Sequence, residues 1–344
     1  MNRGCAMTRE ALTALVESQI AAKAGPLGGE HRPLPDVLLL RCVEPTPLTA
    51  TLYEPVVCVI LRGAKQVILG ETAIQLERGD ALVVSHDLPV VSQITTARPG
   101  EPYVAIIAWL DVALLRSLYD EVGSAAWSIP APSPRSLAAS QADPRLLEAI
   151  RRYIALADDD VEARVLATSV RRELHFRLLM GESGAMLRSL LRHDSHASMI
   201  ARAITRIRAS YREPLVVTQL ARDIGMSPSS LHKHFRAITE TSPLQYQKEL
   251  RLLEARRLLM AGRHAISDVA YEVGYESPNQ FSREYARKYG VPPREDLRGA
   301  GPSSGALVGR HRQAHLDPIG AREEQSEEGV GTSADAPCDQ ARVT

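Results

Sequence analysis

The sequence predicts an α+β protein of two domains, with antiparallel strands in the N-terminal part and only helices in the C-terminal part. The chain has 344 residues, a length typical of two domains. Residues 36–110 contain short Val- and Ile-rich runs separated by Gly, Pro and Asp, a pattern typical of antiparallel strands. Residues 198–298 have the apolar period of helices, and they contain an internal repeat.

The composition excludes several classes of protein. Hydrophobic residues make up 44% of the chain and charged residues 24%, the usual values for a soluble globular protein. No run approaches the length of a membrane-spanning helix, and the first residues lack the apolar core of a secretory signal. Four widely spaced cysteines without a C-x-x-C pattern fit a reducing compartment, so we expect a cytoplasmic protein. They are Cys5, Cys42, Cys58 and Cys338.

The formal net charge is zero, because 41 Lys and Arg residues balance 41 Asp and Glu residues. Taken alone, this value disfavours binding to nucleic acid. The charge is unevenly distributed, however. Residues 198–298 hold 17 basic and 11 acidic residues, a net charge of +6. Residues 1–197, with 20 basic and 23 acidic residues, and residues 299–344, with 4 and 7, are each at −3. The helical segment is therefore modestly basic.

The first elements of the chain are a helix and a set of strands. An amphipathic helix is expected over residues 8–22, with Thr8 as its cap. The strands over 36–110 have hairpin turn signals at 69–72 and 78–80. Six to eight such strands predict a small barrel or sandwich. The apolar stripe of the first helix is Leu12, Leu15, Val16 and Ile20.

Helices return after residue 111. The first has Val112, Leu115, Leu118 and Tyr119 on one face, and a Pro- and Ser-rich loop over 128–144 follows it. Two more helices are expected over residues 146–157 and 161–180, the second ending at Gly181.

These patterns divide the chain into four parts. Residues 1–192 form an N-terminal domain, 193–199 a linker and 200–298 a helical domain. Residues 299–344 are rich in Gly, Ser, Ala and Glu and predict a disordered tail.

The internal repeat relates residues 216–243 to residues 265–293 at an offset of 49 to 50 residues. In each copy an Ala marks a close crossing of helices, and a Gly four residues later suits the left-handed end of a helix. A Ser followed by Pro then starts a second helix, which two apolar residues at i and i+4 would bury. The pattern predicts a helix-turn-helix motif that occurs twice. The expected core of the two motifs is Leu220, Ala221, Gly225, Leu231, Phe235, Val269, Ala270, Gly274, Phe281 and Tyr285.

The helix expected between the motifs, over residues 243–262, separates them by a useful distance. At 1.5 Å per residue it is about 30 Å long. Successive major-groove faces of B-DNA are about 34 Å apart. We therefore expect helices 228–239 and 278–289 to enter two successive segments of the major groove.

The sequence resembles the AraC/XylS family of bacterial transcription regulators. The resemblance is strong over residues 200–298, through LARDIGMSPSSLHKHF and AISDVAYEVGYESPNQFSREYARKYGVPP. It is weaker over 36–192, through EPVVCVILRGAKQVILG, RGDALVVSHDLPVVSQI and EPYVAIIAWLD. The resemblance implies an N-terminal regulatory domain built as a cupin-like β-barrel with flanking helices, which binds a small-molecule effector and mediates dimerisation. It also implies a homodimeric transcription factor of the activator type that binds double-stranded promoter or operator DNA, with RNA polymerase as a further partner. The effector, the operator and the choice between activation and repression stay open.

Two positions depart from the family pattern. Glu240 stands where the family usually has the Gly that closes the first recognition helix, which costs about 1 kcal/mol if the left-handed conformation is kept. Pro293 is followed by Arg-Glu-Asp-Leu instead of the usual x-x-Tyr-Arg, so we expect the final helix to dock less tightly.

The outward faces of the two recognition helices supply the candidate DNA contacts. The positions that usually touch bases in the family match Ser229, Lys233, Asn279 and Arg283. Asn suits adenine, and Arg suits the O6 and N7 atoms of guanine. The basic residues Arg236, Arg287 and Lys288 are expected to contact phosphates. Further DNA contacts are expected from His232, Gln280 and Ser282.

Two other classes of function are alternatives: a cupin-type enzyme with an accessory helical domain, and a non-specific DNA binder. A cupin metal site needs clustered histidines, whereas the barrel region offers only His31 and His86 and no H-x-H pattern. We therefore expect no catalytic residue, no metal and no cofactor. GPSSG at 301–305 matches the G-x-S-x-G pattern, but it lies in the predicted tail. Cys42 and Cys58 are expected to be buried on strands; a redox- or electrophile-sensing role would need an exposed thiol of low pKa.

Overall fold

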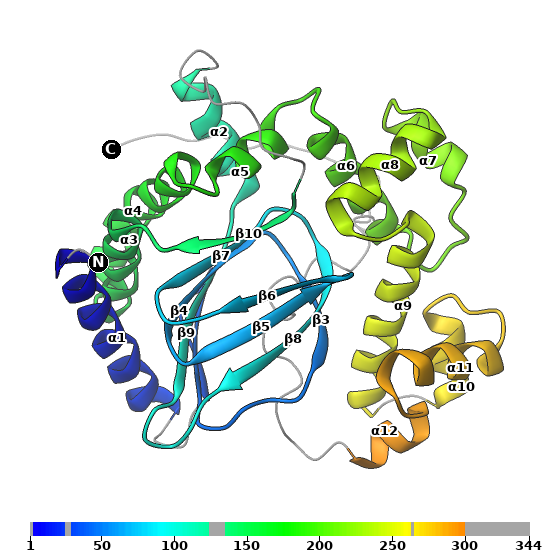
Figure 1. Ribbon diagram of the computed structural model, residues 1–344, viewed down its shortest axis with the longest axis horizontal. Helices are drawn as coiled ribbons and strands as arrows, with labels where there is room; N and C mark the ends of the chain where they lie inside the picture. Colours follow the sequence, from blue (N-terminus) through cyan, green and yellow to red (C-terminus); the bar gives the residue numbers. More distant parts are fainter. Residues whose placement is uncertain (1–2, 25–28, 124–134, 263–264, 300–344) are drawn as a thin grey trace, which may run out of the picture. The chain divides into compact units, whose positions relative to one another are not determined.

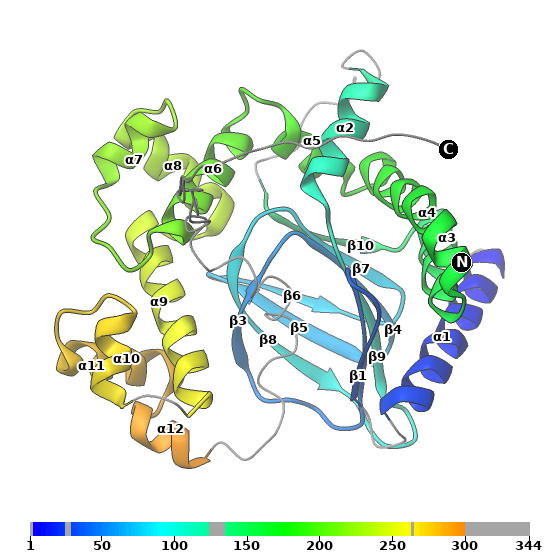
Figure 2. The same cartoon turned by 180° about the vertical axis from the view of Figure 1, so that it is seen from behind.

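The computed structural model describes residues 3–24, 29–123, 135–262 and 265–299. The N-terminal part contains two antiparallel sheets (Figures 1 and 2). The larger sheet has the strand order β1-β2-β9-β4-β7-β10, and the smaller has the order β3-β8-β5-β6. The strands of the larger sheet are β1 (Gly29–Leu34), β2 (Val37–Cys42), β9 (Tyr103–Trp109), β4 (Val56–Arg62), β7 (Asp80–Val84) and β10 (Leu137–Gln141). Those of the smaller are β3 (Thr49–Tyr53), β8 (Leu88–Thr96), β5 (Ala64–Leu69) and β6 (Thr72–Leu76).

The two faces of the larger sheet pack against different layers. Its inner face joins the smaller sheet in one apolar core, which includes Leu38, Ile60 and Ile107. On its outer face lie the side chains that alternate with these, such as Leu39 and Val59, and helices cover this face. These helices are α1 (Arg3–Ala24), α2 (Val112–Val122), α3 (Pro144–Ala155), α4 (Asp160–Met180) and α5 (Gly184–Leu191). The strands thus form the expected barrel with flanking helices.

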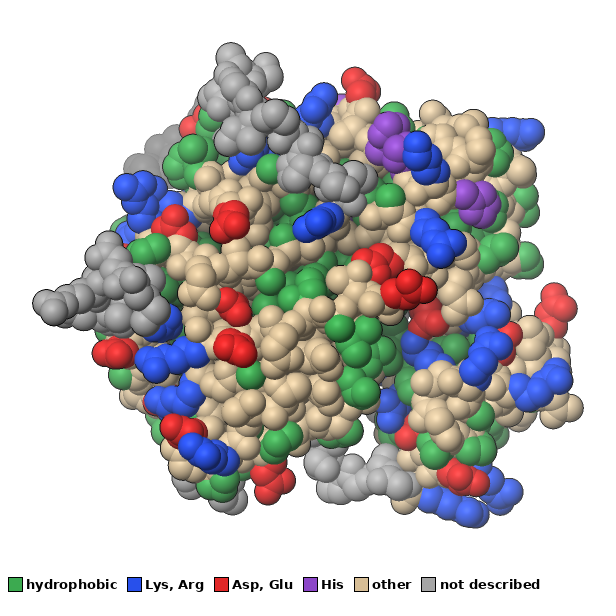
Figure 3. Space-filling model, viewed as in Figure 1, with side chains coloured by type: hydrophobic (Ala, Val, Ile, Leu, Met, Phe, Trp, Pro, Cys, Tyr) green, Lys and Arg blue, Asp and Glu red, His purple; other side chains and the backbone are tan. Residues whose placement is uncertain are grey.

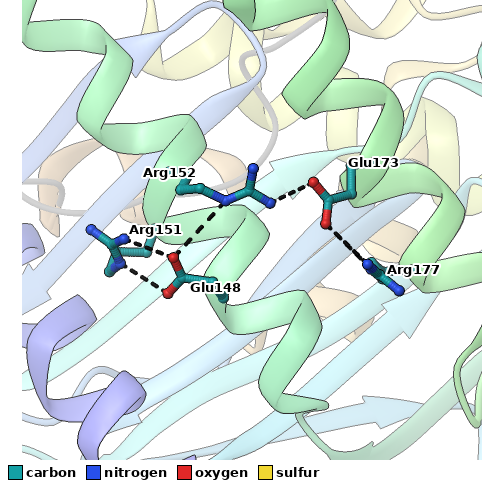
Figure 4. A network of polar contacts seen from close by, with 5 residues as sticks. All are labelled: Glu148, Arg151, Arg152, Glu173 and Arg177. Atoms are coloured by element: carbon teal, nitrogen blue, oxygen red, sulfur yellow. Dashed lines mark hydrogen bonds and ion pairs between the residues drawn. The ribbon is translucent and has the colours of Figure 1, made fainter.

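An ion-pair network holds α3 and α4 together (Figure 4). Arg152 of α3 pairs with Glu173 of α4, which also accepts from Arg177 at 3.2 Å. Glu148 accepts from Arg151 at 2.7 Å, and this guanidinium lowers the pKa of the Glu148 carboxyl. All five side chains remain partly exposed, so each pair contributes little to stability. Only the pair of Arg152 and Glu173 crosses from α3 to α4.

The expected N-terminal elements are present, with several differences. Leu12, Val16 and Ile20 are fully buried, but α1 starts at Arg3, so Thr8 lies inside the helix and does not cap it. The turn at 69–72 closes the β5–β6 hairpin as expected. The turn at 78–80 is not a hairpin, because it leads from β6 in one sheet to β7 in the other.

Two further elements escaped the sequence pattern. Strand β10 lies inside the expected loop 128–144 and pairs with β7 along five residues. Its sequence, LAASQ, has no Val or Ile and no sustained alternation, so only the pairing with β7 makes it a strand. The short helix α5 follows α4 after a turn of three residues, a separation too small to see in the apolar pattern.

The C-terminal part is entirely helical among its described residues. Its helices are α6 (His196–Ala209), α7 (Val217–Asp223), α8 (Pro228–Thr239), α9 (Pro243–Met260), α10 (Ile266–Glu272), α11 (Pro278–Tyr289) and α12 (Pro293–Gly299). Helix α6 begins inside the expected linker 193–199, with Ser195 as its cap. The expected tail lies outside the described residues from residue 300 onward, as does GPSSG at 301–305. Among the described helices, none has the length and apolar character needed to cross a membrane.

Candidate nucleic-acid interface

The first helix-turn-helix consists of α7 and α8. Gly225 follows α7 in the left-handed conformation, with φ of 77°, and so turns the chain. Ser227 then caps α8, because its side chain accepts from the backbone N–H of Ser230 at 3.2 Å. Leu231 and Phe235 are completely buried, so α8 is anchored by its inner face. Val216 is 60% exposed, because it caps α7 instead of lying within it.

The second helix-turn-helix consists of α10 and α11 and repeats these features. Ser277 caps α11, and Phe281 and Tyr285 are completely buried. Gly274 has φ of 90°, and a Cβ at this position would lie 2.1 Å from the carbonyl oxygen of Arg212. Only glycine fits there, both for the backbone conformation and for the space. The apolar residues predicted for the cores of the two motifs are buried, whereas Gly225 is exposed in its turn.

The two motifs sit at opposite ends of α9 (Figures 1 and 2). Tyr246 and Leu250 of α9 belong to the core of the first motif, and Leu252 and Leu259 belong to that of the second. Helix α9 has 18 residues, hence a length of about 27 Å at 1.5 Å per residue. Helix α9 thus holds the recognition helices α8 and α11 apart, and its length is somewhat shorter than the helical repeat of DNA, which is about 34 Å.

Arg251 of α9 links the two motifs, and the sequence pattern did not reveal it. Its guanidinium donates to the carbonyl oxygen of Tyr211 at 2.7 Å and to that of Gly274 at 2.8 Å. It also donates to Arg212 at 3.1 Å and to Glu213 at 3.0 Å. One side chain therefore joins the segment between α6 and α7 to the turn of the second motif. All its acceptors are backbone carbonyl oxygens, and because every residue type has one, the sequence does not indicate these hydrogen bonds.

The four residues predicted to contact bases are all exposed on the recognition helices. Ser229 and Lys233 lie one turn apart on α8, and Asn279 and Arg283 lie one turn apart on α11. Of the other predicted contacts, His232, Arg236, Gln280 and Arg287 are exposed and Ser282 is half-buried.

The basic residues of these outer faces have no acidic partner among the described residues. No ion pair involves Lys233, Arg236, Arg283 or Arg287 within that part of the chain. The basic residues of α9 differ, because Lys248 pairs with Glu284 at 3.1 Å and Arg256 with Asp296 at 2.9 Å. Lys and Arg side chains are spread over this helical part on the face shown in Figure 3. The recognition helices therefore keep their positive charge available for an anionic partner.

Lys288 is placed differently from the other predicted contacts. Its ammonium group turns toward α9 and pairs with Glu249, and only 14% of its side chain is exposed. Burial lowers the pKa of Lys288 to about 8. It therefore serves as a link between α11 and α9 in this structure and does not belong to the outer face.

The two departures from the family pattern have local solutions. Glu240 does adopt the left-handed conformation, with φ of 58°, and its carboxylate accepts from the backbone N–H of Thr72 at 3.3 Å. The looser docking expected of the final helix is not seen. Asp296 of α12 accepts from Arg256 at 2.9 Å and from the Tyr285 hydroxyl at 2.6 Å, and it thereby fixes α12 against both α9 and α11.

Further polar contacts join the barrel to α6 and α9 of the C-terminal part. Nε2 of His86 lies 3.0 Å from the carbonyl oxygen of Ala197, and since that oxygen only accepts, Nε2 carries the proton. Arg208 pairs with Asp87 at 2.5 Å and with Glu54 at 3.2 Å. The Tyr246 hydroxyl donates to the backbone oxygen of Asp87 at 2.8 Å. His86, the one barrel histidine outside β1, is therefore used in this contact.

The two described cysteines lack the properties of a sensing thiol. Burial raises the pKa of the Cys58 thiol, and burial together with Glu30 raises that of Cys42 to about 11. Both therefore stay protonated near neutral pH, which argues against reactive thiolates. Among the described residues, no group of three or more His, Cys, Asp and Glu side chains is arranged to hold a metal ion.

Comparison with known proteins identifies both parts. The model of the AraC-type transcriptional regulator N-terminus matches residues 33–186, and a helix-turn-helix domain model matches residues 220–299. The chain belongs to the AraC/XylS family. This AraC-family chain is similar to the virulence regulon transcriptional activator VirF of Yersinia enterocolitica, with 27% identity over 161 residues. That match covers 47% of this chain and 59% of VirF, so the chain spans little more than half of this curated relative.

Two solved structures are also similar to the AraC-family chain. One is unsaturated fatty acid bound ToxT from Vibrio cholerae, with a TM-score of 0.52 and 10% identity, covering 76% of this chain and 93% of ToxT. At this identity the likeness shows the two-part fold alone. The other is an AraC-type regulator from Chromobacterium violaceum, with 30% identity and a TM-score of 0.30, covering 31% of this chain and 96% of that chain.

Proposed function

We propose that this chain is a sequence-specific, DNA-binding transcription regulator that a small-molecule effector controls. The observation that carries the proposal is the pair of recognition helices, α8 and α11, at opposite ends of α9, whose exposed basic residues have no acidic partner in the described chain. A non-specific binder needs only positive charge. Two rigidly spaced helices with polar side chains at their outer faces suit recognition of two major-groove segments. The proposed place of action is the cytoplasm, where the DNA is.

The proposed base contacts are Ser229, Lys233, Asn279 and Arg283. Arg283 has the fork geometry that recognises guanine, and Asn279 has the amide that recognises adenine. The proposed supporting contacts are His232, Arg236, Gln280, Ser282 and Arg287, with the two arginines on phosphates. Lys288 is left out because Glu249 already occupies its ammonium group.

Effector control would pass through the contacts between the barrel and α6 and α9 of the C-terminal part. Arg208 connects α6 to Asp87 and Glu54 of the barrel, and its side chain is only 20% exposed. A ligand that fits one arrangement of the barrel better than another would shift the population of states in which these contacts are made. The solved structure of ToxT with a bound unsaturated fatty acid supports the proposal that a chain of this fold responds to a small-molecule effector.

A second copy of the chain is the proposed partner of α4. Val161, Val165 and Leu166 in its first half are 62%, 68% and 43% exposed. A cluster of apolar side chains that the described part of the chain leaves uncovered suits pairing with the same cluster of another copy. Val165→Glu should give a monomer in analytical ultracentrifugation. Met180→Glu, at the other end of α4 and 56% exposed, should leave the dimer intact. RNA polymerase is the further partner that an activator would contact.

Selection of binding sites from random duplex DNA by the full chain tests the function. The proposal predicts enrichment of one motif with two elements 10 to 10.5 base pairs apart, the spacing of successive major-groove faces on one side of DNA. Binding without any enriched motif would contradict sequence-specific recognition. It would instead indicate the non-specific DNA binder, whose affinity falls steeply with salt on every sequence.

A further inference from the structure

The interior of the barrel is mainly apolar among the described residues, but the charged residue Lys65 lies within it. On β5 the side chains of Lys65, Val67 and Leu69 alternate with those of Gln66 and Ile68, and the first three are buried. Val67 and Leu69 belong to the core between the two sheets. Lys65 therefore points into the barrel, and only 5% of it is exposed.

The neighbours of Lys65 come from both sheets. Its ammonium nitrogen lies 5.1 Å from the centre of the Tyr53 ring, within the range of a cation–π contact. Tyr103 of β9 and Cys42 of β2 are paired in the larger sheet, and Cys58 lies on the adjacent strand β4. These side chains also face the barrel interior.

The charge of Lys65 is not balanced within the barrel. Burial acts against the ammonium form, but Tyr53 and the thiols of Cys58 and Cys42 outweigh it and raise the pKa of Lys65. Burial keeps Tyr103 and Cys58 neutral, since it raises the pKa of each. No ion pair joins Lys65 to a carboxylate in the described part of the chain.

A second polar group in the same place also lacks a partner. The hydroxyl of Tyr103 is buried and has no hydrogen-bond partner among the described residues. The Cys58 thiol beside it is only a weak hydrogen-bonding group. A buried hydroxyl without a hydrogen-bond partner and a buried ammonium that meets Tyr53 but no carboxylate are each costly. Their occurrence in one apolar core points to a role other than stability.

A ligand with one negative group would pair with the Lys65 ammonium and accept a hydrogen bond from the Tyr103 hydroxyl. We propose that Lys65 is the anion-binding residue of an effector site inside the barrel, that Tyr103 donates a hydrogen bond to the same group, and that the effector is a small monocarboxylate with an apolar body. This inference rests on the proposed function in one respect, that the barrel holds the effector. The apolar body follows from the lining, which includes Leu76 and Ile94 directly opposite Lys65 on the paired strands. Small β-barrels are either filled by their own side chains or hold one small ligand, and the proposal assigns the second case to this barrel.

Direct binding to the full chain, without DNA, tests the inference. Isothermal titration and thermal unfolding would be measured with straight-chain acids from acetate to octanoate and with benzoate, each next to its uncharged amide. At least one acid should bind and raise the unfolding temperature, while its amide should bind at least tenfold more weakly. Lys65→Met should weaken that acid at least tenfold, and Tyr103→Phe should weaken it severalfold. Lys23→Met, which removes an exposed lysine of the same domain, should leave the affinity unchanged.

The variants also report on folding. Methionine removes an uncompensated buried charge at nearly constant volume, so Lys65→Met should unfold at the same or a higher temperature than the natural chain when no ligand is present. The inference is overturned if no acid binds, if an acid and its amide bind equally, or if Lys65→Met binds the acid as the natural chain does. Because selection of DNA sites is measured separately, a regulator whose effector belongs to another class would still enrich a DNA motif.

Discussion

Nη1 of Arg251 donates to the carbonyl oxygen of Gly274 at 2.8 Å, and this bond ties the centre of α9 to the turn of the second helix-turn-helix. The same guanidinium holds three carbonyl oxygens of the segment 211–213. Besides the packing of both cores on α9, the relative placement of the two motifs therefore draws on one side chain that lies away from the outer faces of α8 and α11.

Arg251→Met should weaken the coupling between the two motifs, seen both in unfolding and in simultaneous binding of two DNA elements. The variant leaves several carbonyl groups without their donor, and we expect unfolding to become easier by about 2–4 kcal/mol. Binding to DNA with both elements should weaken about tenfold more than binding to either element alone, because a fixed spacing no longer favours simultaneous docking. Arg257→Met, which removes a pair with Glu254 on the surface of α9, is the control. Equal weakening on complete and half sites would show that Arg251 does not set the spacing.

Gly274→Ala should be far more harmful than Gly225→Ala, although the two glycines hold equivalent places in the repeat. Both have positive φ, so each alanine costs about 1 kcal/mol in backbone strain. At Gly274 the new Cβ would also meet the carbonyl oxygen of Arg212 at 2.1 Å, whereas nothing lies within 4 Å at Gly225. In urea unfolding, we expect Gly274→Ala to lower the free energy of unfolding by more than about 3 kcal/mol and Gly225→Ala to lower it by about 1 kcal/mol. Similar losses at both positions would refute the close approach of Arg212.

The buried ring of His175 predicts a loss of stability in mild acid. Its Nδ1 donates to the backbone oxygen of Arg171 at 2.8 Å, and its Nε2 accepts from the backbone N–H of Asp111 at 2.9 Å. Burial lowers the pKa of His175, so the folded chain holds the neutral ring. As pH falls below the ordinary value of about 6.5, the unfolded chain takes up the proton first, and folding is penalised.

The measurement is the free energy of unfolding between pH 7.5 and 5. Stability should be complete above about pH 6.5 and should decline below it. His175→Gln keeps an acceptor for Asp111 and cannot be protonated, so its decline should be shallower. If this variant follows the natural chain throughout, the decline comes from other groups, such as His86, whose pKa burial also lowers.

The repeat in the sequence predicted the helical part in detail because each of its signals is local. Ser227 and Ser277 cap helices within three residues, and Gly225 and Gly274 act on their own backbone. The barrel was predicted only as a class, since the sheet to which a strand belongs depends on distant partners. The turn at 78–80 shows this, because its residues resemble those of a hairpin although it connects two sheets.

The parts of the candidate site that sequence reasoning missed depend on tertiary contacts. Lys288 and Arg287 are adjacent basic residues near the end of one helix, yet only Lys288 faces Glu249 of α9. Arg251 binds backbone oxygens that any residue would offer. Lys65 occurs in an ordinary strand pattern, and only the packing of the two sheets reveals that its charge is enclosed.

The central claim is that α11 recognises bases, and Arg283→Ala tests it most directly. Affinities of the natural and variant chains would be measured on the selected site and on random duplex DNA at the same salt concentration, with Arg287→Ala as the phosphate-contact control. We expect Arg283→Ala to cost about 1–3 kcal/mol on the selected site and little on random DNA, whereas Arg287→Ala should weaken both alike. Equal losses on the two DNAs for Arg283→Ala would contradict base recognition by this helix.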